Sequence, residues 1–263
     1  MRTRAAVVTV VRGRADHLAR QRRLLAAGPP VTHVVVGMGA PPALDGDGPV
    51  TRSLTVPAPG PLPLAHARNA GAAAALDGGA TLLVFLDVDC LPGPHLLGRY
   101  AGAAARMPDA LLAGPVTYLP AGVLPERDLH DHTAPHPARP SPDDDVLLAE
   151  PRRELFWSLS FAITARAWTA TGGFCEDYTG YGAEDTDFAL ASGLPLYWVG
   201  GAHAYHQHHP QARTDPARIA EIIGNARTFH RRWGWWPMTG WLRELADAGA
   251  IEFDPGRELL RLR

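Results

Sequence analysis

One segment, Leu82 to Pro92, constrains the fold of this chain more than any other. Five consecutive apolar residues, Leu82 to Leu86, end abruptly at Asp87 and Asp89. An uninterrupted apolar run of this length is typical of a strand that is buried on both faces of a parallel sheet. Carboxylates at the carboxyl end of such a strand lie in the crevice where open α/β sheets bind ligands.

The two aspartates allow two interpretations. Acids near a buried strand end are costly unless they hold a cation or a hydrogen-bonded ligand, which favours a hard divalent metal accompanied by a diphosphate. Alternatively, Asp89 caps a helix that begins near Pro92. The acidic pair alone does not decide between the two.

The pattern around this segment alternates between strands and helices. Strands are predicted at 5–11, 31–36, 82–86, 110–116, 155–163 and 194–199, the last being the final strand, and helices at 16–27, 64–76, 93–106, 164–171, 183–191 and 216–231. Residues 38–63 are predicted to form a long loop, and 119–153 an irregular, mobile excursion. This order implies right-handed βαβ units, and therefore an α/β domain whose central, mostly parallel sheet is flanked by helices.

Composition excludes several classes of function. The formal net charge is −2, which argues against broad electrostatic binding of nucleic acid. The chain has 2 cysteines, too few to suggest a disulfide framework. No apolar run approaches the roughly 20 residues that span a bilayer, and the N-terminus lacks a signal-peptide pattern. A cytoplasmic protein is the expectation.

A second acidic cluster follows a glycine-rich turn. Glu184, Asp185 and Asp187 open the helix predicted at 183–191, close to the aromatic Tyr181. Acids in a first helical turn are also favoured by the helix dipole alone, so a purely structural role remains open. The flanking glycines and the aromatic side chain favour a carboxylate that faces a cleft as a general base.

The third cluster is rich in histidine: of the seven residues 203–209, four are histidines, at 203, 206, 208 and 209. A histidine often completes an oxygen-rich metal site. A polar surface loop and a zinc site built from histidines alone are the alternatives. Two arginines, Arg12 and Arg14, follow the first strand, where they could pair with phosphates, and Arg68 lies on the helix that precedes the acidic strand.

Together these motifs resemble the inverting nucleotide-sugar glycosyltransferases of the GT-A fold. The resemblance is to family 2 enzymes whose C-terminal half looks like the β-1,4-galactosyltransferases, and it covers roughly residues 5 to 210. It implies a Rossmann-like GT-A sheet. It also implies that Asp89 binds Mn²⁺ (or Mg²⁺), while Asp87 contacts the ribose or a metal-bound water. The nucleotide-binding residues that it implies are Val10, Arg12, Arg14, Arg68, Asp87 and Val88.

The same resemblance assigns the acceptor side. The family's Trp-Gly-Gly-Glu-Asp is matched by residues 181–185, so Asp185 would be the catalytic base, with Glu184, Tyr181 and Gly182 binding the acceptor. The family's Met-x-x-His is matched by His203-x-x-His206, which makes His206 and His203 metal ligands. This chain departs from the pattern at Tyr181, Ala183 and His203, so acceptor specificity and metal preference do not carry over.

The predicted activity is therefore a metal-dependent, inverting transfer of a sugar from a nucleotide diphosphate, with a UDP-sugar favoured, to an acceptor hydroxyl. The acceptor could be a sugar, a peptide, a small metabolite or a lipid-linked glycan. The alternatives are a nucleotidyltransferase, a metal-dependent hydrolase and a non-catalytic nucleotide- or sugar-binding module.

One domain is predicted over 1–215, with a nucleotide and metal half at about 1–118 and a catalytic half at about 155–215. A helical, tryptophan-rich extension follows at 216–263. Its tryptophans are predicted to pack as core or cap the acceptor site, with peripheral contact to a membrane as the alternative.

Overall fold

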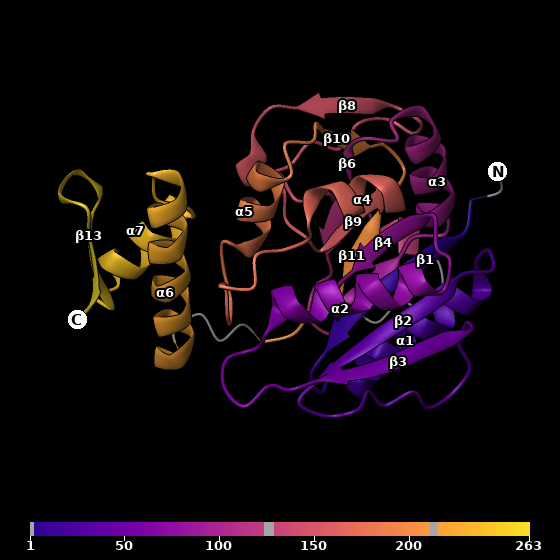
Figure 1. Ribbon diagram of the computed structural model, residues 1–263, viewed down its shortest axis with the longest axis horizontal. Helices are drawn as coiled ribbons and strands as arrows, with labels where there is room; N and C mark the ends of the chain where they lie inside the picture. Colours follow the sequence, from indigo (N-terminus) through magenta and orange to yellow (C-terminus); the bar gives the residue numbers. More distant parts are fainter. Residues whose placement is uncertain (1–2, 124–128, 211–214) are drawn as a thin grey trace.

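The computed structural model describes residues 3–123, 129–210 and 215–263. Its centre is an eight-stranded sheet with the strand order β3-β2-β1-β4-β9-β6-β10-β8 (Figure 1). A three-stranded sheet, β5-β11-β7, and a hairpin, β12-β13, complete the strands. The strands are β1 Ala5–Val11, β2 Thr32–Met38, β3 Thr51–Val56, β4 Leu82–Leu86, β5 Cys90–Pro92, β6 Leu111–Ala113, β7 Val116–Tyr118, β8 Leu147–Glu150, β9 Ser160–Thr164, β10 Leu196–Val199, β11 Ala204–His206, β12 Ile251–Asp254 and β13 Leu259–Leu262.

Helices cover both faces of the central sheet. They are α1 Ala15–Ala27, α2 Leu64–Asp77, α3 Leu96–Arg106, α4 Ala165–Thr171, α5 Glu184–Ala191, α6 Pro216–Trp233 and α7 Thr239–Asp247, with short 3₁₀ turns at Leu129–His132, Arg153–Leu155 and Pro255–Arg257. The predicted fold class, a large sheet flanked by helices, is confirmed. Parallel pairing holds for β3, β2, β1 and β4, whereas β9 pairs antiparallel with both of its neighbours.

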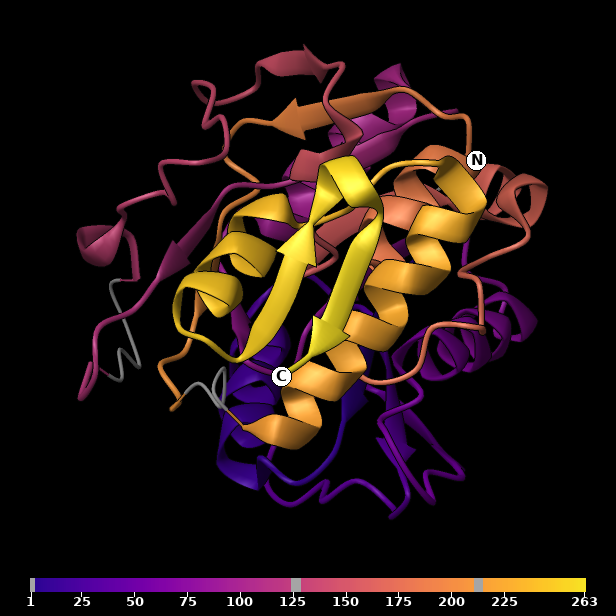
Figure 2. The same ribbon diagram turned by 90° about the vertical axis from the view of Figure 1, so that its left-hand side faces the viewer.

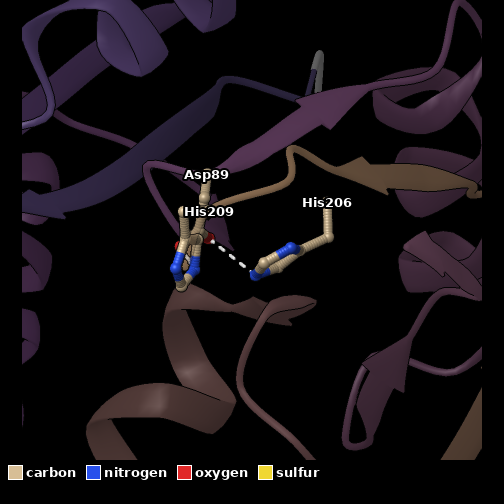
Figure 3. Close-up of side chains that lie close together, drawn as sticks. All are labelled: Asp89, His206 and His209. Atoms are coloured by element: carbon tan, nitrogen blue, oxygen red, sulfur yellow. Dashed lines mark ion pairs between the residues drawn. The ribbon is translucent and has the colours of Figure 1, made fainter. Parts of the chain in front are cut away.

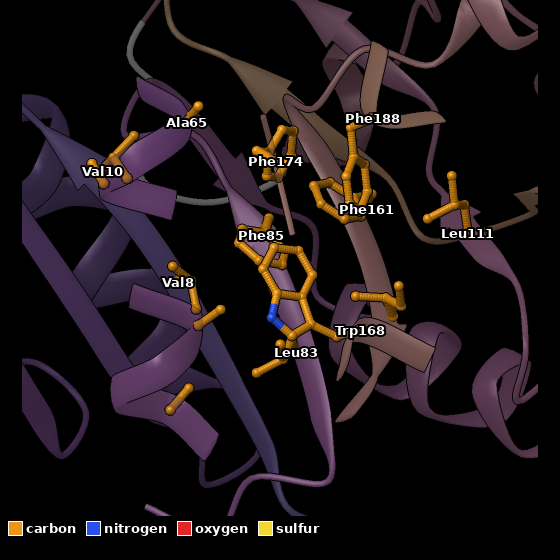
Figure 4. Packing of buried hydrophobic residues seen from close by; sticks show 14 of the residues in the cluster. Val8, Val10, Ala65, Leu83, Phe85, Leu111, Phe161, Trp168, Phe174 and Phe188 are labelled. Carbon is orange, nitrogen blue, oxygen red and sulfur yellow. The ribbon is translucent and has the colours of Figure 1, made fainter. Parts of the chain in front are cut away.

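The alternating side chains of β1 divide the core into two layers. Val8 and Val10 pack with α2 and with a group of aromatic rings from β4, β9, α4 and α5 (Figure 4). In that group Phe85 stacks on Phe161 with the ring centroids 4.5 Å apart. Val7 faces the opposite layer, which contains side chains of α1 and α3. Because successive strand residues point to opposite faces, a wholly apolar strand can serve both layers.

Several short or exposed elements differ from the sequence predictions. The loop predicted at 38–63 contains β3, whose mostly exposed side chains give no apolar run. The excursion predicted at 119–153 contains β8, which pairs antiparallel with β10; its residues 124–128 lie outside the described part of the chain. The strand at 194–199 is not the last, because β11 and a hairpin follow it. The helix predicted from Gly93 begins at Leu96.

The C-terminal segment forms a distinct group of elements. Figures 1 and 2 show α6, α7 and the β12–β13 hairpin gathered on one side of the main body. They share a small core of their own, which includes Ile222, Trp236 and Leu242. The buried carboxylate of Asp187 accepts hydrogen bonds from Arg232 and Trp233 at the end of α6, each 2.7 Å long. Among the described residues, no helix combines the length and the apolar character needed to cross a membrane.

Candidate functional site

The turn that follows β4 is held by a side chain from α1. Its own backbone closes it, because the amide of Cys90 donates to the carbonyl oxygen of Asp87 at 2.8 Å. The buried amide of Gln21 donates to two backbone carbonyl oxygens, those of Asp87 and Cys90, at 2.8 Å each. Val88, between the two aspartates, packs into an apolar cluster with Leu18. The turn is therefore fixed from inside the protein, with the Asp89 side chain 10% exposed and that of Asp87 25% exposed.

Strand pairing brings a histidine to this turn. β11 runs antiparallel to β5, and the register places His206 opposite Cys90. His206 Nε2 lies 3.5 Å from Asp89 Oδ1, and His209 Nε2 lies 3.3 Å from Asp89 Oδ2 (Figure 3). Ligand atoms of these three residues all lie within 4.8 Å of one another. We call Asp89, His206 and His209 the Asp-His-His cluster.

Positive charge surrounds the carboxylate of Asp89. Burial by itself would raise the pKa of Asp89. The hydrogen bond from His209 and the charges of His206 and Arg14 outweigh burial and lower this pKa to about 2. Arg14 forms an ion pair with the same carboxylate from a left-handed backbone conformation, φ 52°, at the start of α1. Asp89 is thus held as an anion that attracts cations.

The donor chemistry of the Asp-His-His cluster fits a divalent transition metal. One carboxylate oxygen and two imidazole nitrogens form a mixed set that Mn²⁺ and Zn²⁺ accept, whereas Mg²⁺ prefers oxygen donors. Burial lowers the pKa of His206, although the charge of Asp89 opposes this shift. The lowered pKa favours the neutral imidazole, which is the form that binds metals. Arg14 pairs with the same carboxylate, so a bound cation would share Asp89 with it or displace it.

His203, predicted as a metal ligand, is not part of the cluster. Its Nε2 lies 2.7 Å from the hydroxyl of Thr117, and its ring packs against Tyr205. Residues three positions apart along an extended segment point to opposite sides, which agrees with the different partners of His203 and His206. The metal role of His203 stays a prediction that this geometry does not support. His209, in the loop after β11, takes the place that the sequence comparison gave to His203.

Arg68 connects the two acidic motifs. This α2 residue is 4% exposed. Its guanidinium donates to Asp87 Oδ1 and to Glu184 Oε1, at 3.2 Å each. Burial raises the pKa of Asp87 to about 6 even though Arg68 opposes that shift. A single arginine therefore joins the turn after β4 to the first turn of α5.

Asp185 lies beside this bridge at the start of α5. Its Oδ1 accepts a hydrogen bond from the backbone amide of Thr186 at 2.8 Å. Burial is the largest cause that raises the pKa of Asp185, and the neighbouring Glu184 carboxylate adds to it. The amide of Thr186 and the charge of Arg68 oppose the shift, and the resulting pKa is about 7. A carboxylate with a pKa near neutrality suits the transfer of a proton.

The predicted acceptor residues are already engaged within the protein. Glu184 Oε2 accepts from the amide of Gly182 at 3.1 Å, so both of its oxygens have partners. Tyr181 is 41% exposed. Its ring stacks on Trp241 of α7, with the centroids 5.8 Å apart, and the guanidinium of Arg218 lies over it at 4.8 Å. The C-terminal segment thus covers this side of the site.

The remaining predicted nucleotide residues divide into buried and exposed positions. Val10 lies in the hydrophobic core, as Val88 does, so each can offer a ligand only its backbone. Arg12 is exposed at the end of β1, two residues before Arg14. These placements leave their nucleotide-binding roles as predictions.

The sequence interpretation missed two residues that shape this site. Gln21 had a weak signal: it lies three positions after Leu18 and four before Leu25, so this polar residue occupies the buried face of α1. His209 was visible in the histidine-rich segment, but an extended-strand pattern cannot say which histidine of a following loop turns back.

Comparisons with known proteins bear on the fold and on the family. No family model matches the chain. It is 29% identical over 194 residues to proteins named validoxylamine A glucosyltransferase from two Streptomyces hygroscopicus subspecies, jinggangensis (strain 5008) and limoneus. The match covers 64% of this chain and 44% and 41% of those proteins, so the chain spans less than half of their length.

Solved structures share the fold at low sequence identity. TarS (residues 1–349) of S. aureus has a TM-score of 0.54 and 12% identity, covering 88% of this chain and 74% of TarS. GalNAc-T7, solved with UDP, GalNAc and Mn²⁺, has a TM-score of 0.55 and 12% identity, covering 94% of this chain and 57% of that one. The predicted GT-A fold is confirmed by these structures, and the sequence is similar to those of the two named glucosyltransferases. The finer resemblance, to family 2 and to the β-1,4-galactosyltransferases, stays a prediction.

Proposed function

We propose that this protein is a metal-dependent, inverting glycosyltransferase that moves a sugar from a nucleotide diphosphate to an acceptor hydroxyl. The observation that carries the proposal is the double contact of Arg68 with Asp87 and Glu184. It joins the acidic turn beside the Asp-His-His cluster to α5, whose second residue is Asp185. One buried arginine thus contacts a neighbour of Asp89 in the proposed metal site, Asp87, and the residue before the proposed base, Glu184.

The leaving-group side of the proposed reaction is formed by the Asp-His-His cluster. Asp89, His206 and His209 would hold Mn²⁺, and Arg14 adds positive charge to the same place. A bound metal ion would neutralise the charge that develops on the departing diphosphate. Asp87, held by Arg68, would orient the nucleotide beside it.

Asp185 is the proposed base. It would take the proton from the acceptor hydroxyl as that oxygen attacks the anomeric carbon, while the bond from that carbon to the diphosphate breaks. A single displacement of this kind inverts the anomeric configuration and needs no covalent intermediate. Glu184, which accepts hydrogen bonds from both Arg68 and Gly182, keeps the first turn of α5 in position.

The similar proteins suggest which donor and acceptor to test first. GalNAc-T7 was solved with UDP and Mn²⁺, which favours a uridine nucleotide. The sequence relatives are named for a glucosyl group and for validoxylamine A as its acceptor. UDP-glucose and validoxylamine A are therefore the first pair to offer this chain.

A thermal-shift screen of UDP-, GDP- and dTDP-sugars, each with and without Mn²⁺, tests the proposal. A ligand that binds only the folded state stabilises it by about 2.7 kcal/mol at 100 times its Kd. We expect a UDP-sugar to raise the melting temperature only when Mn²⁺ is present, and Asp89→Ala to remove that shift. The absence of a metal-dependent shift with any nucleotide would refute the proposal.

A further inference from the structure

A buried arginine beside the proposed site forms no side-chain hydrogen bond or ion pair with any described residue, and the nearby Asp185 acts on its charge without touching it. Arg139, between the first 3₁₀ turn and β8, is 5% exposed. Its Nε, Nη1 and Nη2 atoms are all buried and have no hydrogen-bond partner among the described residues. A buried charge left without hydrogen bonds is strongly destabilising. Such an arrangement calls for a counter-ion, and no described residue supplies one by direct contact.

Two tryptophans hold the guanidinium by its faces. It lies 4.7 Å from the ring centroid of Trp157 and 5.3 Å from that of Trp198. Cation–π contacts of this kind position the flat group but leave its N–H bonds, which lie in its plane, without acceptors. The unsatisfied chemistry of Arg139 is thus a buried planar fork of donors, which matches a carboxylate or a phosphate.

The surroundings of Arg139 connect it to both halves of the proposed site. Tyr118 stacks on His206 at 4.6 Å, His136 packs against Tyr118 at 5.4 Å, and Trp157 follows at 5.3 Å. We call these rings, from His206 to Trp157, the ring row. The backbone of Ser158, the residue after Trp157, forms a hydrogen bond with Asp185 that lowers the pKa of this carboxyl. The ring row therefore leads from a proposed metal ligand to the neighbour of the proposed base.

The histidines near Arg139 cannot serve as its counter-ion, because an imidazole is either neutral or positively charged. Burial, together with the charge of Arg139, lowers the pKa of His203 to about 4. Burial and Arg139 lower the pKa of His136 in the same way. Both rings are therefore neutral at pH 7, and Arg139 has no salt bridge within the described residues.

We propose that Arg139, held between Trp157 and Trp198, binds an anionic oxygen group of the nucleotide-sugar donor. The inference rests on the proposed function, because the ring row joins the leaving-group side to the base, and the donor's diphosphate and transferred sugar would lie between those two. The anion is either the donor's diphosphate or a carboxylate on the transferred sugar, as in a uronic acid. Arg139 would then select the donor rather than carry out the chemistry.

Binding of four probes to wild type and variants tests this proposal. Calorimetric titration in the presence of Mn²⁺ compares uridine, UDP, UDP-glucose and UDP-glucuronate. Arg139→Met places an uncharged side chain between Trp157 and Trp198. Arg139→Lys keeps a positive charge but lacks the planar set of N–H donors. Arg166→Gln is the matched control, because Arg166 is an exposed residue paired with Asp109. Loss of a charged hydrogen-bonded pair should raise Kd by about tenfold or more.

The probes distinguish the two sources of the anion. If Arg139→Met weakens UDP-glucuronate alone, the partner is the sugar carboxylate. If it weakens UDP and both UDP-sugars but not uridine, the partner is the diphosphate. In either case the ligand-free Arg139→Met variant should have a melting temperature equal to or above that of wild type, because an unsatisfied buried charge has been removed. If Arg139 had only a structural role, its replacement would lower the melting temperature.

Two results would overturn the inference. If the Arg139 variants bind all four probes within twofold of wild type, Arg139 has no role in donor recognition, while the proposed function stands. If wild type itself binds no nucleotide, the proposed function fails and this inference fails with it. Should Arg139→Met not fold, Arg139→Gln, which also removes the charge, replaces it in the same comparison.

Discussion

Two aspartates at this site have pKa values shifted in opposite directions. Asp89, surrounded by imidazoles and a guanidinium, has a pKa of about 2, whereas Asp185, beside another carboxylate, has a pKa of about 7. Environment rather than residue type thus separates a cation-binding acid from one that can exchange a proton. The separation agrees with the proposed roles of metal ligand and base.

The pH dependence of transfer follows from Asp185. A base must be deprotonated to act, so kcat/KM should rise with pH up to about 7 and then level off. An aspartate with an ordinary pKa would give a flat profile over the same range. Asp185→Asn should lower kcat by about 100-fold or more while leaving the Kd for UDP within a few fold. Loss of UDP binding instead would show that Asp185 belongs to the nucleotide site.

Metal binding distinguishes two histidines of the same segment. His209→Ala removes a member of the Asp-His-His cluster and should weaken Mn²⁺ binding by at least about tenfold. His203→Ala, the matched control, removes only a hydrogen bond to Thr117 and should leave the Mn²⁺ affinity unchanged. Titration of Mn²⁺ followed by electron paramagnetic resonance measures both. The reverse order of effects would restore His203 as the ligand.

At the level of secondary structure, the site depends on how elements end. β4 stops at a turn that α1 fastens through Gln21, and the three-residue strand β11 brings His206 to the same turn. Longer elements such as β1, β4 and α2 could be predicted from the sequence because an apolar run or an alanine-rich segment extends over several residues. Three-residue strands show no period, so β11 could not be predicted.

Removing the Gln21 clamp should loosen the acidic turn. Gln21→Leu leaves the carbonyl oxygens of Asp87 and Cys90 without their donor, at a cost of about 1–3 kcal/mol for each buried group. We expect a lower free energy of unfolding in urea and also weaker Mn²⁺ binding by the folded variant. Gln21→Met, of similar volume, should behave alike, because the loss is of donors rather than packing. Unchanged Mn²⁺ affinity in both variants would mean that the turn holds its shape without the clamp.

At the scale of the whole molecule, the site combines parts that are distant along the chain. Arg68 joins β4 to α5, β11 returns a histidine to β5, and Trp241 of the C-terminal segment stacks on Tyr181. Sequence motifs singled out Asp87, Asp89 and Asp185, whose roles in the site stay predictions. The motifs could not predict the hydrogen bonds of Gln21, the place of His209 in the Asp-His-His cluster, or the lack of a side-chain hydrogen bond to Arg139 among the described residues. Each of these depends on contacts between elements far apart in sequence.

The anomeric configuration of the released sugar tests the central claim most directly. In UDP-glucose the bond to the diphosphate is α, so a single displacement by water or by an acceptor must give the β product. Proton NMR of glucose freshly released by wild type with Mn²⁺ should show the β anomer first, and Asp185→Asn should show almost no release. An initial α anomer, or a release rate that does not change when Mn²⁺ is removed, would contradict the account.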